Sequence, residues 1–203
     1  MNKKTISIIG GVVVLIIIAV GYQIFTVYKN KQHENTSSSL EAVHNKEFGI
    51  SFSYPSGQDG FALLEPNGTE KGILKSYIMI PSSDFDAYKE KPGGEAPAGM
   101  NVFIFALDAK ATGTEEVSRI TELQTWASDN SIVTAIKLAK KTPEVVDLDG
   151  VKALHYQADG LYQQDIYLLS YKGRVYMFVG QYDKETDYTY TAFQSLIKTV
   201  TLD

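Results

Sequence analysis

Three carboxylates at alternate positions form an acidic elbow near the C-terminal end of the sequence. Asp183, Glu185 and Asp187 occur in the stretch DKETDYTYTAFQ. Oxygen ligands at the first, third and fifth positions are typical of a calcium loop. The sixth position is Tyr188 instead of glycine and the twelfth is Gln194 instead of glutamate, so the pattern then fails. We therefore expect the carboxylates to cap the helix that follows, with cation binding as the alternative.

Nucleophilic catalysis needs a histidine beside a nucleophile and an acid. His155 is the histidine of the predicted globular domain, and it lies in a predicted strand; the sequence contains no Gly-x-Ser-x-Gly elbow. His33 and His44 lie in a polar segment without ligand spacing. The pair Asp147 and Asp149 flanks a predicted turn, where Asp is expected for backbone reasons. We predict no catalytic, cofactor-binding or metal-ligating residue.

Composition excludes several classes of protein. The chain of 203 residues contains no cysteine, which excludes disulfides, thiolate metal sites and an acylated N-terminal cysteine. It has 19 Lys and Arg against 24 Asp and Glu, with no basic cluster larger than Lys140 and Lys141. Nucleic acid is therefore not an expected partner. Eight tyrosines between Tyr156 and Tyr190 could form a sugar-stacking surface, although β-propensity and cross-strand pairing also explain them.

The N-terminal segment predicts a membrane anchor. No charged residue occurs between Lys4 and Lys29, and this apolar stretch is long enough to cross a bilayer as a helix. We expect residues 1–29 to be a transmembrane signal-anchor helix whose partner is the lipid bilayer, with the C-terminal domain extracytoplasmic. The alternative is a cleaved signal peptide, since Ala19 and Gly21 form a small-x-small pair.

The remaining chain divides into a spacer and one domain. Residues 30–45 are polar and Ser-rich, which predicts a flexible linker, and residues 46–203 form the globular domain. That domain opens with the alternating strand FGISFSYPSG. The stretch Pro81–Gly99 is rich in Pro, Gly and charge, and predicts either a mobile, partner-facing loop or a plain surface insertion. A helix that carries Trp126 as a core residue is expected after it.

The C-terminal third predicts an antiparallel meander. Two-residue turns are expected at Asp149-Gly150, Asp159-Gly160 and Lys172-Gly173, between β-branched and aromatic runs. The last runs are apolar at both alternating sets of positions, so their strands need cover on both faces. Two helices are expected to cover the two faces of the sheet. One is the helix at Trp126, and the other is the last helix, whose apolar stripe includes Phe193 and Leu196. The fold class predicted is α+β, an antiparallel β-sheet covered by helices on both faces.

The opening FGISFSYPSG and the closing GRVYMFVGQYDKETDYTYTAFQSLIKTVTL resemble the PsbP-like domains, which are related in fold to the Ran-binding Mog family. The likeness spans most of Lys46–Leu202. It implies an α/β/α sandwich and an anchored or secreted bacterial protein without a catalytic motif. A helix stands here in place of the acylated cysteine of lipoprotein relatives.

These observations predict a membrane-tethered, extracytoplasmic binding domain with a protein partner and no catalysis. The alternatives are a hydrolase or other enzyme with an unrecognised site, or an envelope protein that binds carbohydrate or a cation. The enzyme alternative predicts a pocket that gathers His155 or several carboxylates.

Overall fold

The computed structural model describes residues 38–66, 72–90, 97–107 and 116–203. They belong to one compact unit, Ser38–Asp203. The strands are β1 (Ser39–Asn45), β2 (Ile50–Ser56), β3 (Phe61–Leu64), β4 (Ile73–Pro81), β5 (Met100–Ala106), β6 (Glu144–Leu148), β7 (Val151–Asp159), β8 (Gln163–Tyr171), β9 (Arg174–Tyr182) and β10 (Thr201–Leu202). The helical segments are α2 (Ser82–Glu90), α3 (Glu116–Asp129), α4 (Ser131–Thr134), the 3-10 helix η1 (Ile136–Leu138) and α5 (Tyr188–Ile197).

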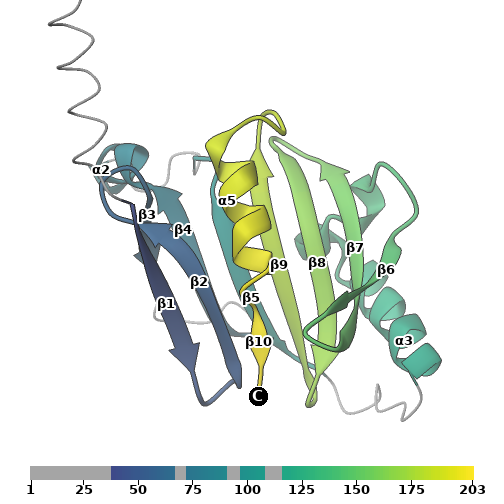
Figure 1. Cartoon of the computed structure of the whole chain (residues 1–203). Helices are drawn as coiled ribbons and strands as arrows, with labels where there is room; N and C mark the ends of the chain where they lie inside the picture. The colour runs from purple at the N-terminus through teal and green to yellow at the C-terminus, as the bar shows by residue number, and fades with distance from the viewer. Residues whose placement is uncertain (1–37, 67–71, 91–96, 108–115) are drawn as a thin grey trace, which may run out of the picture. The chain divides into compact units, whose positions relative to one another are not determined.

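These ten strands form one mixed sheet (Figure 1). Its order is β1-β2-β3-β4-β5-β9-β8-β7-β6, with β10 paired to β2. The pairing of β2 with β3 is parallel and consists of a single bridge between Ser56 and Phe61, whereas the other strand pairs are antiparallel. Apart from its pairing with β10, the β1–β2 hairpin is thus joined to the rest of the sheet at one point only.

The predicted fold class, an antiparallel sheet covered by helices on both faces, is wrong. The sheet is mixed, and the described helices take up little of its surface: α5 contacts β9 and β2, while α3 contacts β7 and β8. The opening strand explains the difference. Its alternating apolar side chains were expected on a half-buried strand of one sheet, but the β1–β2 hairpin packs them against β4, β5 and β9, beside α5.

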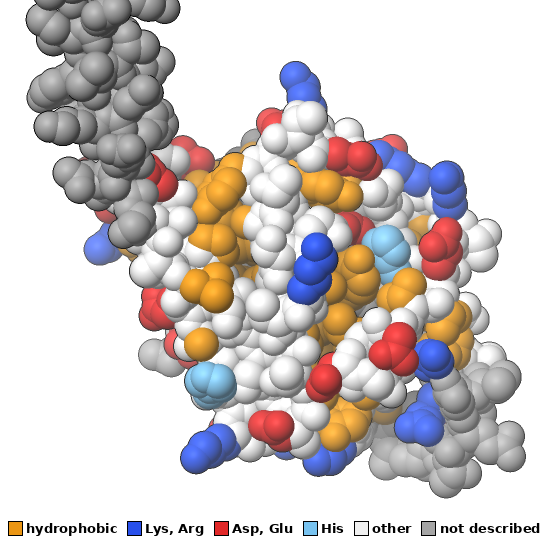
Figure 2. Space-filling view, viewed as in Figure 1, with side chains coloured by type: hydrophobic (Ala, Val, Ile, Leu, Met, Phe, Trp, Pro, Cys, Tyr) orange, Lys and Arg blue, Asp and Glu red, His pale blue; other side chains and the backbone are white. Residues whose placement is uncertain are grey.

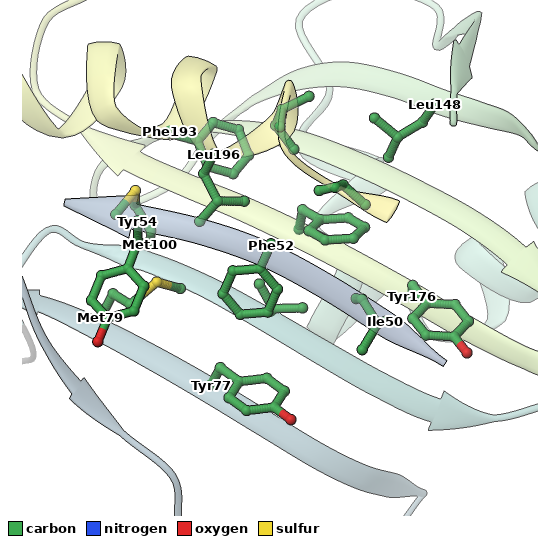
Figure 3. Close-up of a cluster of buried hydrophobic side chains, with 14 of the residues drawn as sticks. Ile50, Phe52, Tyr54, Tyr77, Met79, Met100, Leu148, Tyr176, Phe193 and Leu196 are labelled. Carbon is green, nitrogen blue, oxygen red and sulfur yellow. The ribbon is translucent and has the colours of Figure 1, made fainter. Parts of the chain in front are cut away.

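The core on this side of the sheet is built around β2. Its burial alternates strictly, and Ile50, Phe52 and Tyr54 are each at most 2% exposed. Figure 3 shows these side chains in one cluster with Met79 of β4 and Met100 of β5. The ring of Phe52 meets that of Tyr77 edge-on at 5.4 Å between centroids. Aromatic and aliphatic burial of this extent holds the hairpin against the sheet.

Strand β9 is buried on both faces, as its sequence predicts. Tyr176 and Phe178 belong to the core with β2 and α5, whereas Val175, Met177 and Val179 belong to the core with α3. Two cores on alternate residues of one strand are the physical reason that β9 reads as a continuous apolar run.

The predicted C-terminal meander is confirmed, with β6, β7, β8 and β9 paired in sequence order. Asp149 and Gly150 both have positive φ (52° and 75°), as do Lys172 and Gly173 (46° and 73°), which is the conformation of a type I′ turn. The third turn differs from the prediction. Strand β7 continues to Asp159 and β8 begins at Gln163, so the connection has a third residue.

Strand β1 occupies Ser39–Asn45, a stretch assigned to the spacer in the sequence analysis. Most of its side chains are exposed because it is an edge strand, and this hides the alternation that would identify it. The predicted anchor, residues 1–29, lies outside the described residues. Among the described helices, none has the length and apolar character needed to span a bilayer.

The segments that follow β4 and β5 are both partly helical. The stretch Pro81–Gly99 contains α2, so its first half is an ordered helix rather than the predicted loop. Helix α3 carries Trp126, whose ring meets Phe105 at 5.2 Å between centroids. Trp126 is thus a core residue, as predicted.

Candidate functional site

An open groove of about 700 Å³ lies where the β1–β2 hairpin separates from β3. One wall is the inner face of the hairpin, which contributes Glu41, Tyr54 and Ser56. The other wall is formed by Leu63 of β3 and by the first turns of α2, with Phe85 and Asp86. The groove therefore combines apolar side chains with two carboxylates.

Cross-strand pairing sets the hairpin wall. Glu41 lies opposite Tyr54, and Ser39 lies opposite Ser56. The Tyr54 hydroxyl donates a hydrogen bond of 2.9 Å to Oε2 of Glu41, and the two serine hydroxyl oxygens are 2.8 Å apart. These bonds fix one carboxylate in the groove on a buried aromatic support.

The electrostatic potential at Tyr54 on this wall is negative. Burial raises the pKa of Tyr54, and the hydrogen bond to Glu41 and the charges of Glu41 and Glu65 raise it further. Glu65 is partly compensated by Lys75, whose Nζ lies 2.6 Å from its Oε2. Tyr54 therefore stays protonated and remains a hydrogen-bond donor to Glu41 at neutral pH.

The backbone of β3 has an unpaired edge in this groove. The amide of Ser82 donates to the carbonyl of Gly60 at 3.0 Å, so the backbone of Gly60 faces β4. Because backbone groups alternate along a strand, Ala62 and Leu64 also face β4, and Phe61 and Leu63 face the opposite edge. Phe61 meets Ser56 of β2 there. The pairing ends at that bridge, which leaves the N–H and C=O of Leu63 without a strand partner among the described residues.

A second group of polar side chains surrounds Asp165 of β8, a residue only 1% exposed. Its Oδ1 lies 2.6 Å from Nε2 of His155 on β7, and its Oδ2 accepts a hydrogen bond of 2.5 Å from Gln194 on α5. The imidazole also stacks on Tyr167, with ring centroids 4.3 Å apart. We call Asp165, His155, Tyr167 and Gln194 the Asp165 cluster. It ties two strands to the helix above them.

Three tyrosines near this cluster have raised pKa values. Burial raises the pKa of Tyr167 to about 12, and the charge of Asp165 contributes to the shift. Burial is also the main cause that raises the pKa values of Tyr182 and Tyr190, followed by the charge of Asp165. The hydroxyl of Tyr182 is buried and has no hydrogen-bond partner among the residues that the structure describes. A buried phenol without a partner is costly, and ionising it beside Asp165 costs still more.

Raising the pH above 10 is therefore expected to unfold the domain. The pKa of Tyr167 is about 12 in the folded chain against 10.0 for an unperturbed tyrosine, so the folded state holds its proton more tightly. This stabilisation is complete below pH 10 and is lost as the pH rises toward about 12. Tyrosinate absorbance and the fluorescence of the single tryptophan should change together; a tyrosinate titration complete near pH 10 with unchanged tryptophan fluorescence would contradict this expectation.

The carboxylates of the acidic elbow do not gather at one site. Asp187 precedes α5 as predicted for a cap, but its Oδ2 accepts the amides of Asp183 and Lys184, at 3.0 and 2.9 Å. The carboxylate thus closes the turn before the helix and makes no side-chain bond to the helix itself. Glu185 accepts from the side chain of Gln157. Among the described residues, no three His, Asp or Glu side chains gather closely enough to hold a metal ion.

The other residues singled out from the sequence take structural places. Asp147 accepts the amide of Gly150 within its turn, as predicted, and Asp149 accepts the amide of Leu202 in β10. His44 contacts the hydroxyl of Ser51 at 2.9 Å, and His33 lies outside the described residues. Several of the C-terminal tyrosines are buried, so their rings are not available as a stacking surface: Tyr156, Tyr176 and Tyr182.

Sequence reasoning missed the groove and the partner of His155. Both depend on which strands become neighbours.

Figure 2 shows the surface on the face that carries α5. Charged side chains of both signs are scattered over it with apolar surface between them, and they form no large patch of a single charge on this face.

Comparison with known proteins gives matches only among solved structures: no family model and no curated protein matches the chain. The solution structure of cyanobacterial PsbP from Synechocystis is 14% identical in sequence, with a TM-score of 0.48 over 83% of this chain and 95% of that one. A crystal structure from Bacteroides thetaiotaomicron is 10% identical, with a TM-score of 0.42 over 80% of this chain and 48% of that one. Cyanobacterial PsbP is thus one of the solved structures to which this chain is similar, as the resemblance of its opening and closing segments predicts.

Proposed function

We propose that this chain is a membrane-tethered, extracytoplasmic interaction domain that holds a segment of a partner protein in the groove, without catalysis. The observation that carries the proposal is the groove itself, open to solvent at the point where the sheet divides. It offers apolar contact from Leu63 and Phe85, fixed polar groups from the hairpin, and unpaired backbone. These are the elements from which protein segments are recognised at sheet edges.

The tether rests on the sequence. The uncharged stretch between Lys4 and Lys29 is long enough to cross a bilayer, and a domain that follows a signal-like helix is translocated largely regardless of its own charge. The domain then lies on the outer side, where it meets partners of the envelope.

The enzyme alternative has one observation in its favour, the contact of His155 with Asp165, which resembles the base and orienting acid of a hydrolase. The position of the pair argues for a structural role. His155 lines neither the groove nor a hollow of about 280 Å³ beside α3, and Asp165 is also bonded to Gln194. The buried carboxylate of Asp165 thus connects side chains of β7 and α5. We therefore assign the contact between His155 and Asp165 to the stability of the fold.

Site-specific photo-crosslinking of the full chain in its native membrane tests the proposal. A photoreactive phenylalanine analogue is placed at Phe85 or at Gln58, both of which line the groove. The control position is Leu138, a residue 53% exposed on η1. Both groove positions should give adducts that map to the same segment of one protein, and the control should not.

A synthetic peptide of the mapped segment should then bind the purified full chain. Replacing Ala62, which lines the groove, by Trp should weaken that binding about tenfold by filling the space. Adducts that are equal at all three positions, or peptide binding that Ala62→Trp does not change, would contradict the groove as the binding site.

A further inference from the structure

The unpaired edge of β3 continues the main sheet. From β6 to β3 the strands form one uninterrupted ladder, and β3 ends that ladder because β2 leaves it after the Ser56–Phe61 bridge. Beyond the bridge, Leu63 presents one donor and one acceptor toward the groove. An exposed edge of this kind is a template for another strand.

The connection between β2 and β3 explains why β2 does not cover the edge of β3. The connection between β2 and β3 is short, and the amide of Gly60 closes it by donating to the carbonyl of Gly57 at 3.1 Å. A Cβ on Gly60 would lie 2.5 Å from the carbonyl oxygen of Ser56. Strand β2 ends at Ser56, where this tight corner begins, so β2 does not pair with β3 beyond Phe61. The space between them is the groove.

The charges of the groove are of one sign. Among the described residues that line it, the ionised side chains are Glu41 and Asp86, one on each wall. Glu65 follows β3 directly and adds to the negative potential at Tyr54. A segment that enters this space meets carboxylates on both sides, which favours lysine and arginine and disfavours acidic side chains.

We propose that the partner's segment binds as an added β-strand on the free edge of β3, with Lys or Arg side chains directed at Glu41 and Asp86. This inference rests on the proposed function and specifies its partner as an extended basic segment of another protein. Main-chain bonds to Leu63 supply register, and alternate side chains meet the two walls.

Three short peptides of equal length test the inference with the full chain in detergent micelles. The first alternates Val with Lys, the second alternates Val with Glu, and the third is the Val-Lys peptide with its backbone amides N-methylated on one edge. Affinity is measured by fluorescence anisotropy. The Val-Lys peptide should bind, the Val-Glu peptide should bind at least about tenfold more weakly, and N-methylation should cost about tenfold because it removes the donors of the strand.

Amide hydrogen exchange gives a second readout. The amide of Leu63 should exchange more slowly when the Val-Lys peptide is bound, whereas the amide of Ala62, which faces β4, should not change. Glu41→Gln should weaken binding of the Val-Lys peptide and reduce its salt dependence. Glu144→Gln, on the exposed edge strand β6, is the matched control and should leave both unchanged.

The outcomes separate this inference from the function on which it rests. If the N-methylated peptide binds as tightly as the Val-Lys peptide, strand addition is contradicted. If the Val-Glu peptide binds as tightly as the Val-Lys peptide, the preference for a basic partner is contradicted. Crosslinks from Phe85 to a partner whose segment does not protect Leu63 would leave the interaction domain standing and overturn the added strand. Crosslinks from Phe85 to a second copy of this chain, or to its own residues 1–37, would overturn both.

Discussion

Gly180→Ala is expected to lower the free energy of unfolding by about 1–3 kcal/mol, the usual range for overpacking a tight core. Gly180 lies on β9, between Met100 of β5 and Asp165 of β8. A Cβ there would lie 2.4 Å from Cγ of Phe193 and 2.5 Å from its Cδ1. Carbon atoms in contact prefer about 3.5–4.0 Å, so the ring must move. Phe193 is 1% exposed on α5, and its displacement disturbs the packing of the helix on the sheet.

Gly160→Ala is the matched control. A Cβ on Gly160 has its nearest neighbours at 3.5 Å, an ordinary contact, so the substitution should change stability by less than about 0.5 kcal/mol. Urea unfolding can be followed with the fluorescence of Trp126, the single tryptophan of the chain. Equal midpoints for the two variants would show that α5 can shift without cost, contrary to the close approach of Phe193 and β9.

Asp165→Ala is expected to destabilise the domain by about 3 kcal/mol. The substitution removes the acceptor of two side chains at once, His155 on β7 and Gln194 on α5. Removing the buried member of this hydrogen-bonded group leaves two partly buried side chains, His155 and Gln194, without their acceptor. The free energy of unfolding from urea titration measures the loss.

Two variants show whether burial is the cause. Asp165→Asn keeps an oxygen that can accept from Gln194 and should lose less stability than Asp165→Ala. Asp159→Ala breaks the pair of Asp159 with Lys140, in which the aspartate is 67% exposed, and should cost less than about 1 kcal/mol. If Asp165→Ala is no more harmful than Asp159→Ala, the Asp165 cluster contributes no more than a surface ion pair.

The parts of the fold that depend on local sequence could be predicted. The turns at Asp149-Gly150 and Lys172-Gly173 need positive φ at both residues, and the Asp-Gly and Lys-Gly pairs meet that need locally. The apolar stripe of α5 identified its buried face, with Phe193 and Leu196 in the core. Such features follow from neighbouring residues, so the sequence suffices to predict them.

The hairpin of β1 and β2 could not be placed in this way. The alternation of Phe48–Tyr54 shows that one face is buried, but it does not show against what. The structure places that face on β4, β5 and β9, beside α5, and the groove lies where the hairpin meets β3. Tertiary neighbours therefore decided both the fold class and the site.

The partner of His155 was hidden by register. A two-residue turn at Asp159-Gly160 would place His155 opposite Gln164, and the side chain of Asp165 would then point to the other face. The longer connection in the structure places His155 opposite Tyr167. This shift by an odd number of residues brings Asp165 to the face of His155. A turn that begins one residue later and is one residue longer thus decides whether His155 meets Asp165.

The pairing of β2 with β10 also determines when the domain can be completed. The amide of Ser53 donates to the hydroxyl of Thr199, across 146 positions of the chain. Contacts of such high sequence separation form late, because a long loop must close before they contribute. During vectorial synthesis the apolar face of β2 is made early and waits for β9, α5 and β10 before it is covered. Until then Phe52 and Tyr54 lack the side chains of β9 and α5 that cover them in the folded domain.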